Sequence, residues 1–262
     1  MKCRAGAWVV AMALLAGAVR VPAQEQPAAA ATVGPNQALT PGDFLDNVGK
    51  QAKARWRQLY RAAPPAAPSE RLRVAFMLGA LVGDSYLAQK AGDAQQFKNT
   101  NQDLINYCRV LGMGEKVTPG FLAAAKAAER EDWPAVRKLV SESEGLIERL
   151  LIEQRDEELA TLVTLGMWMR LFEITTSIVM NDEDNISNKT LCIGSIPLLT
   201  SLEARFEKLS QDTRDSDAIA RLGTVLDVLQ RHWENTNGHP GQDVIDMTSE
   251  KLNFLMTRLT QR

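Results

Sequence analysis

Two segments of this chain, residues 70–91 and 159–180, are apolar on nearly every side of a helix. A helix that borders water carries polar residues along one face, so a helix without such a face belongs inside a bundle. Runs of β-branched residues are absent, and no Asn-Gly or Asp-Gly turn joins two alternating stretches. The sequence therefore predicts an all-α fold with these two segments as its central helices.

Caps and breakers divide the rest of the chain into further helices. Thr40-Pro41 and Asp132-Trp133-Pro134 each place a capping residue before a proline, which is typical of a helix start. The polar stretch 153–158 interrupts a long apolar stripe, where an unbroken helix would exceed the width of a compact domain. We therefore expect one all-α domain, residues 41–262, that forms a bundle of eight or nine helices.

Two helix junctions share a local pattern. Residues 88–97 and 127–136 both show a small residue, an acid at the turn and a new helix start, 39 residues apart. This pattern resembles the junctions of tetratricopeptide-type helical hairpins, but the other signature positions of that repeat are missing. Stacked helical hairpins are one arrangement that the bundle can take, and the pattern assigns no family.

The N-terminus has the parts of a secretory signal. A basic start precedes the apolar residues 5–19, and Val21-Pro22-Ala23 offers small residues for cleavage near Ala23. The apolar run is too short for a membrane anchor, and no second run of about 18 apolar residues follows. We predict a signal peptide at 1–23, a flexible linker at 24–40 and a soluble exported protein. The alanine-rich signal favours a bacterial periplasm.

Net charge and motifs exclude several classes of function. Cleavage would leave 27 of the 30 basic side chains and all 32 acidic ones, a net charge of −5, which argues against nucleic-acid binding. His232 and His239 lie seven residues apart, too far to share one helix face as metal ligands. Phosphate-binding glycine loops and dinucleotide motifs are also absent from the sequence. We therefore expect no metal site and no cofactor.

Two cysteines remain after signal cleavage, Cys108 and Cys192. Export makes a disulfide between them one interpretation, and it would close a loop of about 84 residues. Both cysteines also have apolar neighbours, and a free thiol among such residues is an ordinary core side chain.

The first predicted helix carries basic residues along one face, opposite an apolar face. It begins at Pro41 and is expected to end before the prolines at 64 and 65. Such a helix binds an anionic membrane surface or an acidic partner, or it packs on its own domain with its charges in water. The candidate surface-binding residues are Lys50, Lys53, Arg57 and Arg61.

Three charged residues interrupt the central helices. Asp84 lies on an apolar stripe of the first, and Arg170 and Glu173, three residues apart, are the only charges between Leu159 and Met180 of the second. Buried charges without partners cost several kcal/mol, so we expect the three to meet or to reach water. If they meet, they form either an ion network that fixes helix register or a pocket for a ligand or a reaction.

These features favour an exported helical protein that binds a partner protein or a small ligand without catalysis. One alternative is a carboxylate-based hydrolase or lyase with its site between the central helices, because acid–base pairs leave no reliable spacing signature. Another is a peripheral envelope component held by the basic first helix. A deep polar pocket between helices would favour a ligand or an enzyme, and a long apolar groove with a charged rim would favour a partner.

Overall fold

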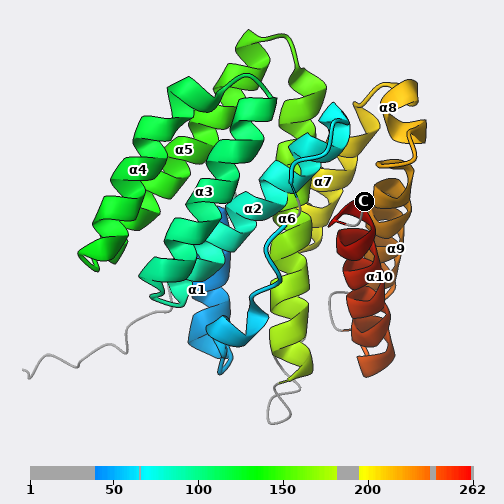
Figure 1. Cartoon of the computed structure of the whole chain (residues 1–262). Coiled ribbons are helices and arrows are strands. Elements are labelled where there is room, and N and C mark those ends of the chain that lie inside the picture. The colour runs from blue at the N-terminus through cyan, green and yellow to red at the C-terminus, as the bar shows by residue number, and fades with distance from the viewer. Residues whose placement is uncertain (1–38, 65, 182–194, 237–239, 261–262) are drawn as a thin grey trace, which may run out of the picture. The chain divides into compact units, whose positions relative to one another are not determined.

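The computed structural model describes residues 39–64, 66–181, 195–236 and 240–260, all within one compact unit that spans Leu39–Arg262. Helices are the only regular secondary structure in these residues, as Figure 1 shows. A short 3₁₀ helix, η1 (Trp56–Leu59), follows the first α-helix. The α-helices are α1 (Pro41–Gln51), α2 (Arg71–Lys90), α3 (Ala94–Val110), α4 (Gly114–Glu129), α5 (Trp133–Glu153), α6 (Glu157–Met180), α7 (Ile196–Glu207), α8 (Gln211–Asp215), α9 (Ala220–Asn235) and α10 (Gln242–Thr260).

The all-α prediction is therefore confirmed, with α2 and α6 at the centre of the bundle. Ten α-helices lie in the described residues instead of eight or nine, because α8 adds a helix of only five residues. Neither α2 nor α6 has a polar face, and both are buried along most of their length. α3 to α5 lie beside α2 on one side, and α7, α9 and α10 lie on the other side of α6 (Figure 1).

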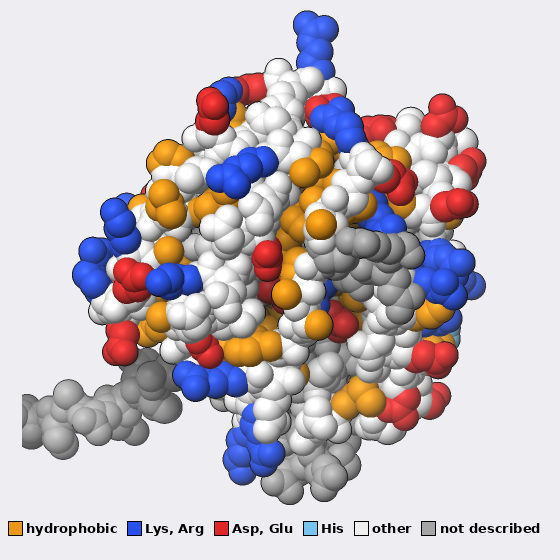
Figure 2. Space-filling view, viewed as in Figure 1, with side chains coloured by type: hydrophobic (Ala, Val, Ile, Leu, Met, Phe, Trp, Pro, Cys, Tyr) orange, Lys and Arg blue, Asp and Glu red, His pale blue; other side chains and the backbone are white. Residues whose placement is uncertain are grey.

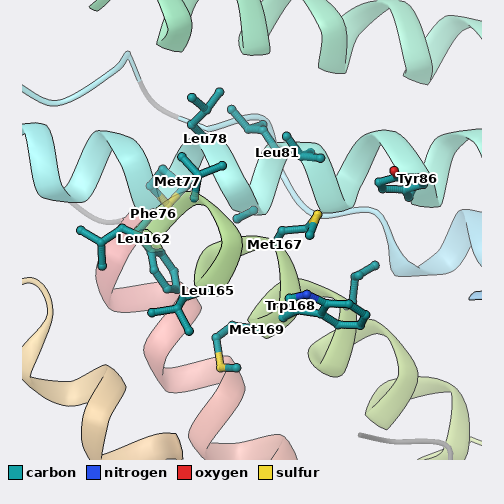
Figure 3. Packing of buried hydrophobic residues seen from close by; sticks show 14 of the residues in the cluster. Phe76, Met77, Leu78, Leu81, Tyr86, Leu162, Leu165, Met167, Trp168 and Met169 are labelled. Carbon is teal, nitrogen blue, oxygen red and sulfur yellow. The ribbon is translucent and has the colours of Figure 1, made fainter. Parts of the chain in front are cut away.

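Glycines let α2 and α6 approach each other closely. A Cβ atom at Gly79 would overlap the carbonyl oxygen of Val163, and one at Gly166 would overlap that of Phe76. Gly79 and Gly166 therefore allow backbone-to-backbone contact that any larger residue would prevent. Around this contact, side chains of α2 and α6 such as Met77, Leu81 and Met167 pack together, as Figure 3 shows.

An aromatic cluster fastens α1 to α6. Phe44 packs edge-on against Trp168 and Phe172, with ring centroids 5.5 and 6.0 Å apart. Thr40 caps α1 by accepting from the backbone N–H of Asp43, with proline at the first helical position. The predicted start of this helix is thus the observed one.

The four turns from α2 to α6 repeat one geometry. Each has a residue with positive φ, and the next residue donates its N–H to the carbonyl five positions back, which closes the preceding helix. Asp93 and Asp132 then cap α3 and α5 through their side chains, which explains the pattern shared by 88–97 and 127–136. The positive-φ residues are Gly92, Gly112, Glu131 and Arg155.

The first helix is shorter than predicted. α1 ends at Gln51, where Ala52 turns to extended backbone, and Trp56 folds back against Gly49 with Lys90 5.8 Å from its ring. The apolar residues beyond Gln51 therefore pack on the bundle because the chain folds back, and not because the helix continues. The expectation that Lys50, Lys53, Arg57 and Arg61 share one helix face is wrong for this reason.

Among the described helices, α6 alone is long and apolar enough to cross a membrane, judged by length and composition. Within its most apolar window, 83% of the residues are buried in the bundle, as in a core helix. The predicted signal peptide (1–23) and most of the linker (24–40) lie outside the described residues.

Candidate functional site

Arg170 of α6 lies at the centre of the buried charges and is only 3% exposed. Its Nε donates to Asp84 Oδ1 at 2.7 Å, and its Nη1 donates to Glu173 Oε2 at 2.7 Å. Its Nη2 donates to the carbonyl oxygen of Leu59, also at 2.7 Å. The structure thus brings together the three charged residues singled out from the sequence. Every nitrogen of this guanidinium has an acceptor, as a buried cation requires.

A second arginine completes the network. Arg61 Nε donates to Asp84 Oδ2 at 2.8 Å, and Arg61 Nη2 lies 2.7 Å from the same oxygen. The terminal nitrogens of Arg61 are buried and make no well-aligned hydrogen bond within the described chain. Asp84 therefore lies between two guanidiniums, and we call Asp84, Arg170, Glu173 and Arg61 the central ion network.

Packing positions this network as much as charge does. An ideal Cβ atom at Gly83 would lie 3.1 Å from Cγ of Arg170, so the glycine leaves room for the arginine stem. Burial alone would lower the pKa of Arg170, but the charges of Asp84 and Glu173 outweigh it and raise the pKa above its ordinary value. Arg170 is therefore a permanent cation in the folded protein.

A pocket of about 300 Å³ lies directly beside the network. Arg61 and Glu173 supply its charges, and the segment after η1 and α10 supply the rest of its wall. The other lining residues are Ala62, Ala63, Pro64, Met256 and Thr257. Its volume is at the lower end of the range typical of small-ligand sites.

A third carboxyl group lies near the network, on α3. Burial raises the pKa of Asp103 above its ordinary value, and the charge of Asp84 raises it further. Tyr107, one helical turn later, also has a raised pKa, mainly because of burial. Neither residue could be singled out from the sequence, because their proximity to the network depends on how α3 packs against α2.

The remaining basic candidates do not join this site. Lys50 and Lys53 are exposed, and Arg57 is an exposed residue whose Nε lies 3.6 Å from Asp93 Oδ2. Arg61 alone of the four turns inward. Sequence reasoning placed it on a surface helix, although the buried Asp84 was a signal that another base was required nearby.

Of the two cysteines Cys108 and Cys192, the described residues include only Cys108. Cys108 is a buried thiol, and burial raises its pKa to about 12, which makes it unreactive at neutral pH. Cys192 belongs to the segment 182–194, outside the described residues, so the bridge with Cys108 stays a prediction.

Among the described residues, no group of three or more His, Cys, Asp or Glu side chains has the arrangement of a metal site. Apolar side chains on the face in Figure 2 form separate patches between charges of both signs. Comparison with protein-family models, with curated proteins and with solved structures found no match.

Proposed function

We propose that this chain is an exported binding module that holds a small polar ligand in the pocket beside Arg61 and Glu173. The observation that carries the proposal is the pocket of about 300 Å³, which borders two members of the central ion network. A concave site with a few convergent polar groups and apolar walls is the usual form of a small-ligand site.

The residues of this pocket indicate the chemistry of its ligand. Arg61 offers donors, and its terminal nitrogens lack well-aligned acceptors in the described chain. Glu173 offers an acceptor, and Ala62, Ala63 and Met256 add apolar surface. A matching ligand carries an anionic or acceptor group, a cationic or donor group, and an apolar part of a few carbon atoms.

A partner protein is a weaker proposal. The large apolar residues exposed on the described surface are scattered over the ends and outer faces of different helices. Binding of an envelope surface by the first helix is also weaker, since α1 ends before Lys53. The exposed large apolar residues are Val110, Leu122, Ile152, Met180 and Phe254.

The proposal is tested by filling the pocket without touching the network. Ala63 and Ala66 are both exposed in the same segment, but only Ala63 lines the pocket. Native mass spectrometry of protein purified from its own host should show a noncovalent small-molecule adduct. The adduct should be lost in Ala63→Trp and kept in Ala66→Trp. An absent adduct, or equal loss in both variants, would contradict the proposal.

A carboxylate-based hydrolase or lyase is the second candidate, and the raised pKa of Asp103 favours it. A carboxyl group with a raised pKa is better suited to act as a general acid than an ordinary one, and Asp84, held by its ion pair with Arg170, lies nearby. Asp103→Asn separates the two candidates once a retained molecule is identified. A binding module keeps the same molecule in this variant, whereas an enzyme would accumulate its substrate in place of its product.

A further inference from the structure

A second pocket, distinct from the one at Arg61, lies where the start of α2, the start of α9 and the end of α10 meet. Its volume is about 210 Å³. Three arginines line it, one from each helix: Arg73, Arg221 and Arg258. We call it the arginine cleft. The end of α10, which supplies Arg258 to this pocket, lies close to the label C in Figure 1.

Contacts with groups other than carboxylates hold these guanidiniums in place within the described residues. Arg73 Nε donates to the carbonyl oxygen of Leu259 at 2.6 Å. Arg221 and Arg258 lie 5.2 and 5.3 Å from the centre of the Phe254 ring, whose face attracts cations. Within the described chain none of the three forms an ion pair with an acid, unlike Arg170 and Arg61.

Two carboxylates, Glu70 and Asp217, also line the cleft. Both lie at or just before the first turn of a helix, α2 or α9, where a negative charge is favoured by the helix dipole. Neither forms an ion pair with the arginines in the described chain, and the lining keeps a net positive charge. The repulsion among three cations in one cleft is relieved when an anion enters.

We propose that the arginine cleft binds a phosphate-sized oxyanion, either free phosphate or the phosphate of a lipid headgroup. A guanidinium presents parallel N–H donors that match two oxygens of such an anion, and three of them converge here. A volume of about 210 Å³ accepts a phosphate group together with a few ordered waters. The site stands independently of the pocket at Arg61, with which it shares no lining residue.

Isothermal titration of inorganic phosphate into the full chain, at ionic strength held constant with chloride, tests the proposal. We expect one phosphate per chain, and binding weakened about tenfold or more in Arg221→Gln and Arg258→Gln. Both residues are exposed, so these variants should fold, which circular dichroism checks. The matched control is Arg231→Gln, which removes the same charge from α9 at an exposed pair with Asp227, outside the cleft. The control should bind phosphate as the parent chain does.

A second arm distinguishes the two sources of phosphate. Vesicles of phosphatidylcholine, with and without phosphatidic acid, are sedimented with the parent chain and the same variants. Free phosphate binding that depends on the cleft supports a soluble ligand, and sedimentation that needs both phosphatidic acid and Arg258 supports a lipid headgroup. Absence of both, or equal loss in Arg231→Gln, overturns the proposal.

Discussion

The interface of α2 with α6 and the arginine cleft both contain arginines, but in opposite circumstances. Arg170 is almost fully buried, and each of its nitrogens meets an acceptor from Asp84, Glu173 or Leu59. Arg221 and Arg258 are exposed, and their observed contact is an aromatic ring. The same side chain therefore fastens the core in one region and stays available to a ligand in the other.

The difference follows from what surrounds each residue. At the α2–α6 interface, glycines bring the backbones together and exclude water, so an unmatched charge there would be costly. At the cleft, three helix ends meet without filling the space, and water can solvate a cation that has no partner. A buried arginine therefore needs a charged or polar partner within the protein, whereas an exposed arginine can stay available to a ligand.

The largest expected difference in stability is between a variant that loses the buried arginine and one that loses an exposed arginine. Arg170→Met leaves the buried Asp84 and the half-buried Glu173 without their shared cation, and should lower the free energy of unfolding by about 3–5 kcal/mol. Arg258→Met at the exposed site should change it by no more than about 0.5 kcal/mol. Urea denaturation of both variants measures the difference. Similar values for the two would break the comparison.

Asp84→Asn keeps the shape of the side chain but removes the charge that Arg170 and Arg61 share. We expect a loss of about 2–3 kcal/mol in the free energy of unfolding, because two charge-assisted hydrogen bonds are weakened. Thermal unfolding followed by circular dichroism measures it. A near-normal melting temperature together with loss of a retained ligand would instead make the network part of the binding site.

Gly79→Ala tests the close packing that creates the buried region. The added methyl would collide with the carbonyl oxygen of Val163, and separating the helices should cost about 1–3 kcal/mol. Gly145→Ala in α5 is the matched control, since its nearest neighbour would be a flexible arginine end at 3.4 Å. The control should be neutral or stabilising by up to about 1 kcal/mol. Chemical denaturation that found both variants equally stable would show that the backbones do not meet.

Glu144 offers a further comparison, because it is a half-buried carboxyl group whose hydrogen-bond partner is a tyrosine instead of an arginine. Burial raises its pKa, and the hydrogen bond from Tyr86, 2.7 Å long, offsets only part of that shift. The folded protein thus holds this proton more tightly than the unfolded chain. Its contribution to stability is full below the ordinary pKa of 4.5 and is lost as the pH rises through the raised folded value.

Glu144→Gln should therefore stabilise the protein at pH 7, by less than about 1 kcal/mol, and have little effect at pH 4. Melting temperatures of the parent and the variant across this pH range provide the measurement. A destabilising effect that grows with pH would mean that the carboxylate is the favoured form in the fold.

Much of the fold could be predicted because its constraints are local. The central helices were expected at 70–91 and 159–180 and are observed at Arg71–Lys90 and Glu157–Met180. A helix that is apolar on all sides is stable only in the interior of a bundle, which made these two predictable. The break between α5 and α6 lies within the polar stretch expected there. The end of α1 was missed, because apolar spacing alone does not distinguish a helix from a chain that folds back.

The site could be predicted only where burial itself was predictable. Asp84, Arg170 and Glu173 were found because charges on an apolar helix need partners. Arg61, Asp103 and Gly166 join the site or its packing through contacts between segments that are distant in the sequence. The residue pattern within one segment does not indicate its contacts with a distant segment. The arginine cleft was missed for the same reason, because each of its arginines comes from a different helix.

Labelling of individual arginines with phenylglyoxal, read by peptide mass spectrometry, tests the contrast between the two regions most directly. The account predicts that Arg221 and Arg258 of the native protein react rapidly and are protected by phosphate. Arg170 should react only after unfolding, because its guanidinium is buried and fully bonded. Rapid labelling of Arg170 in the native protein, or resistance of Arg221 and Arg258 without phosphate, would contradict the account.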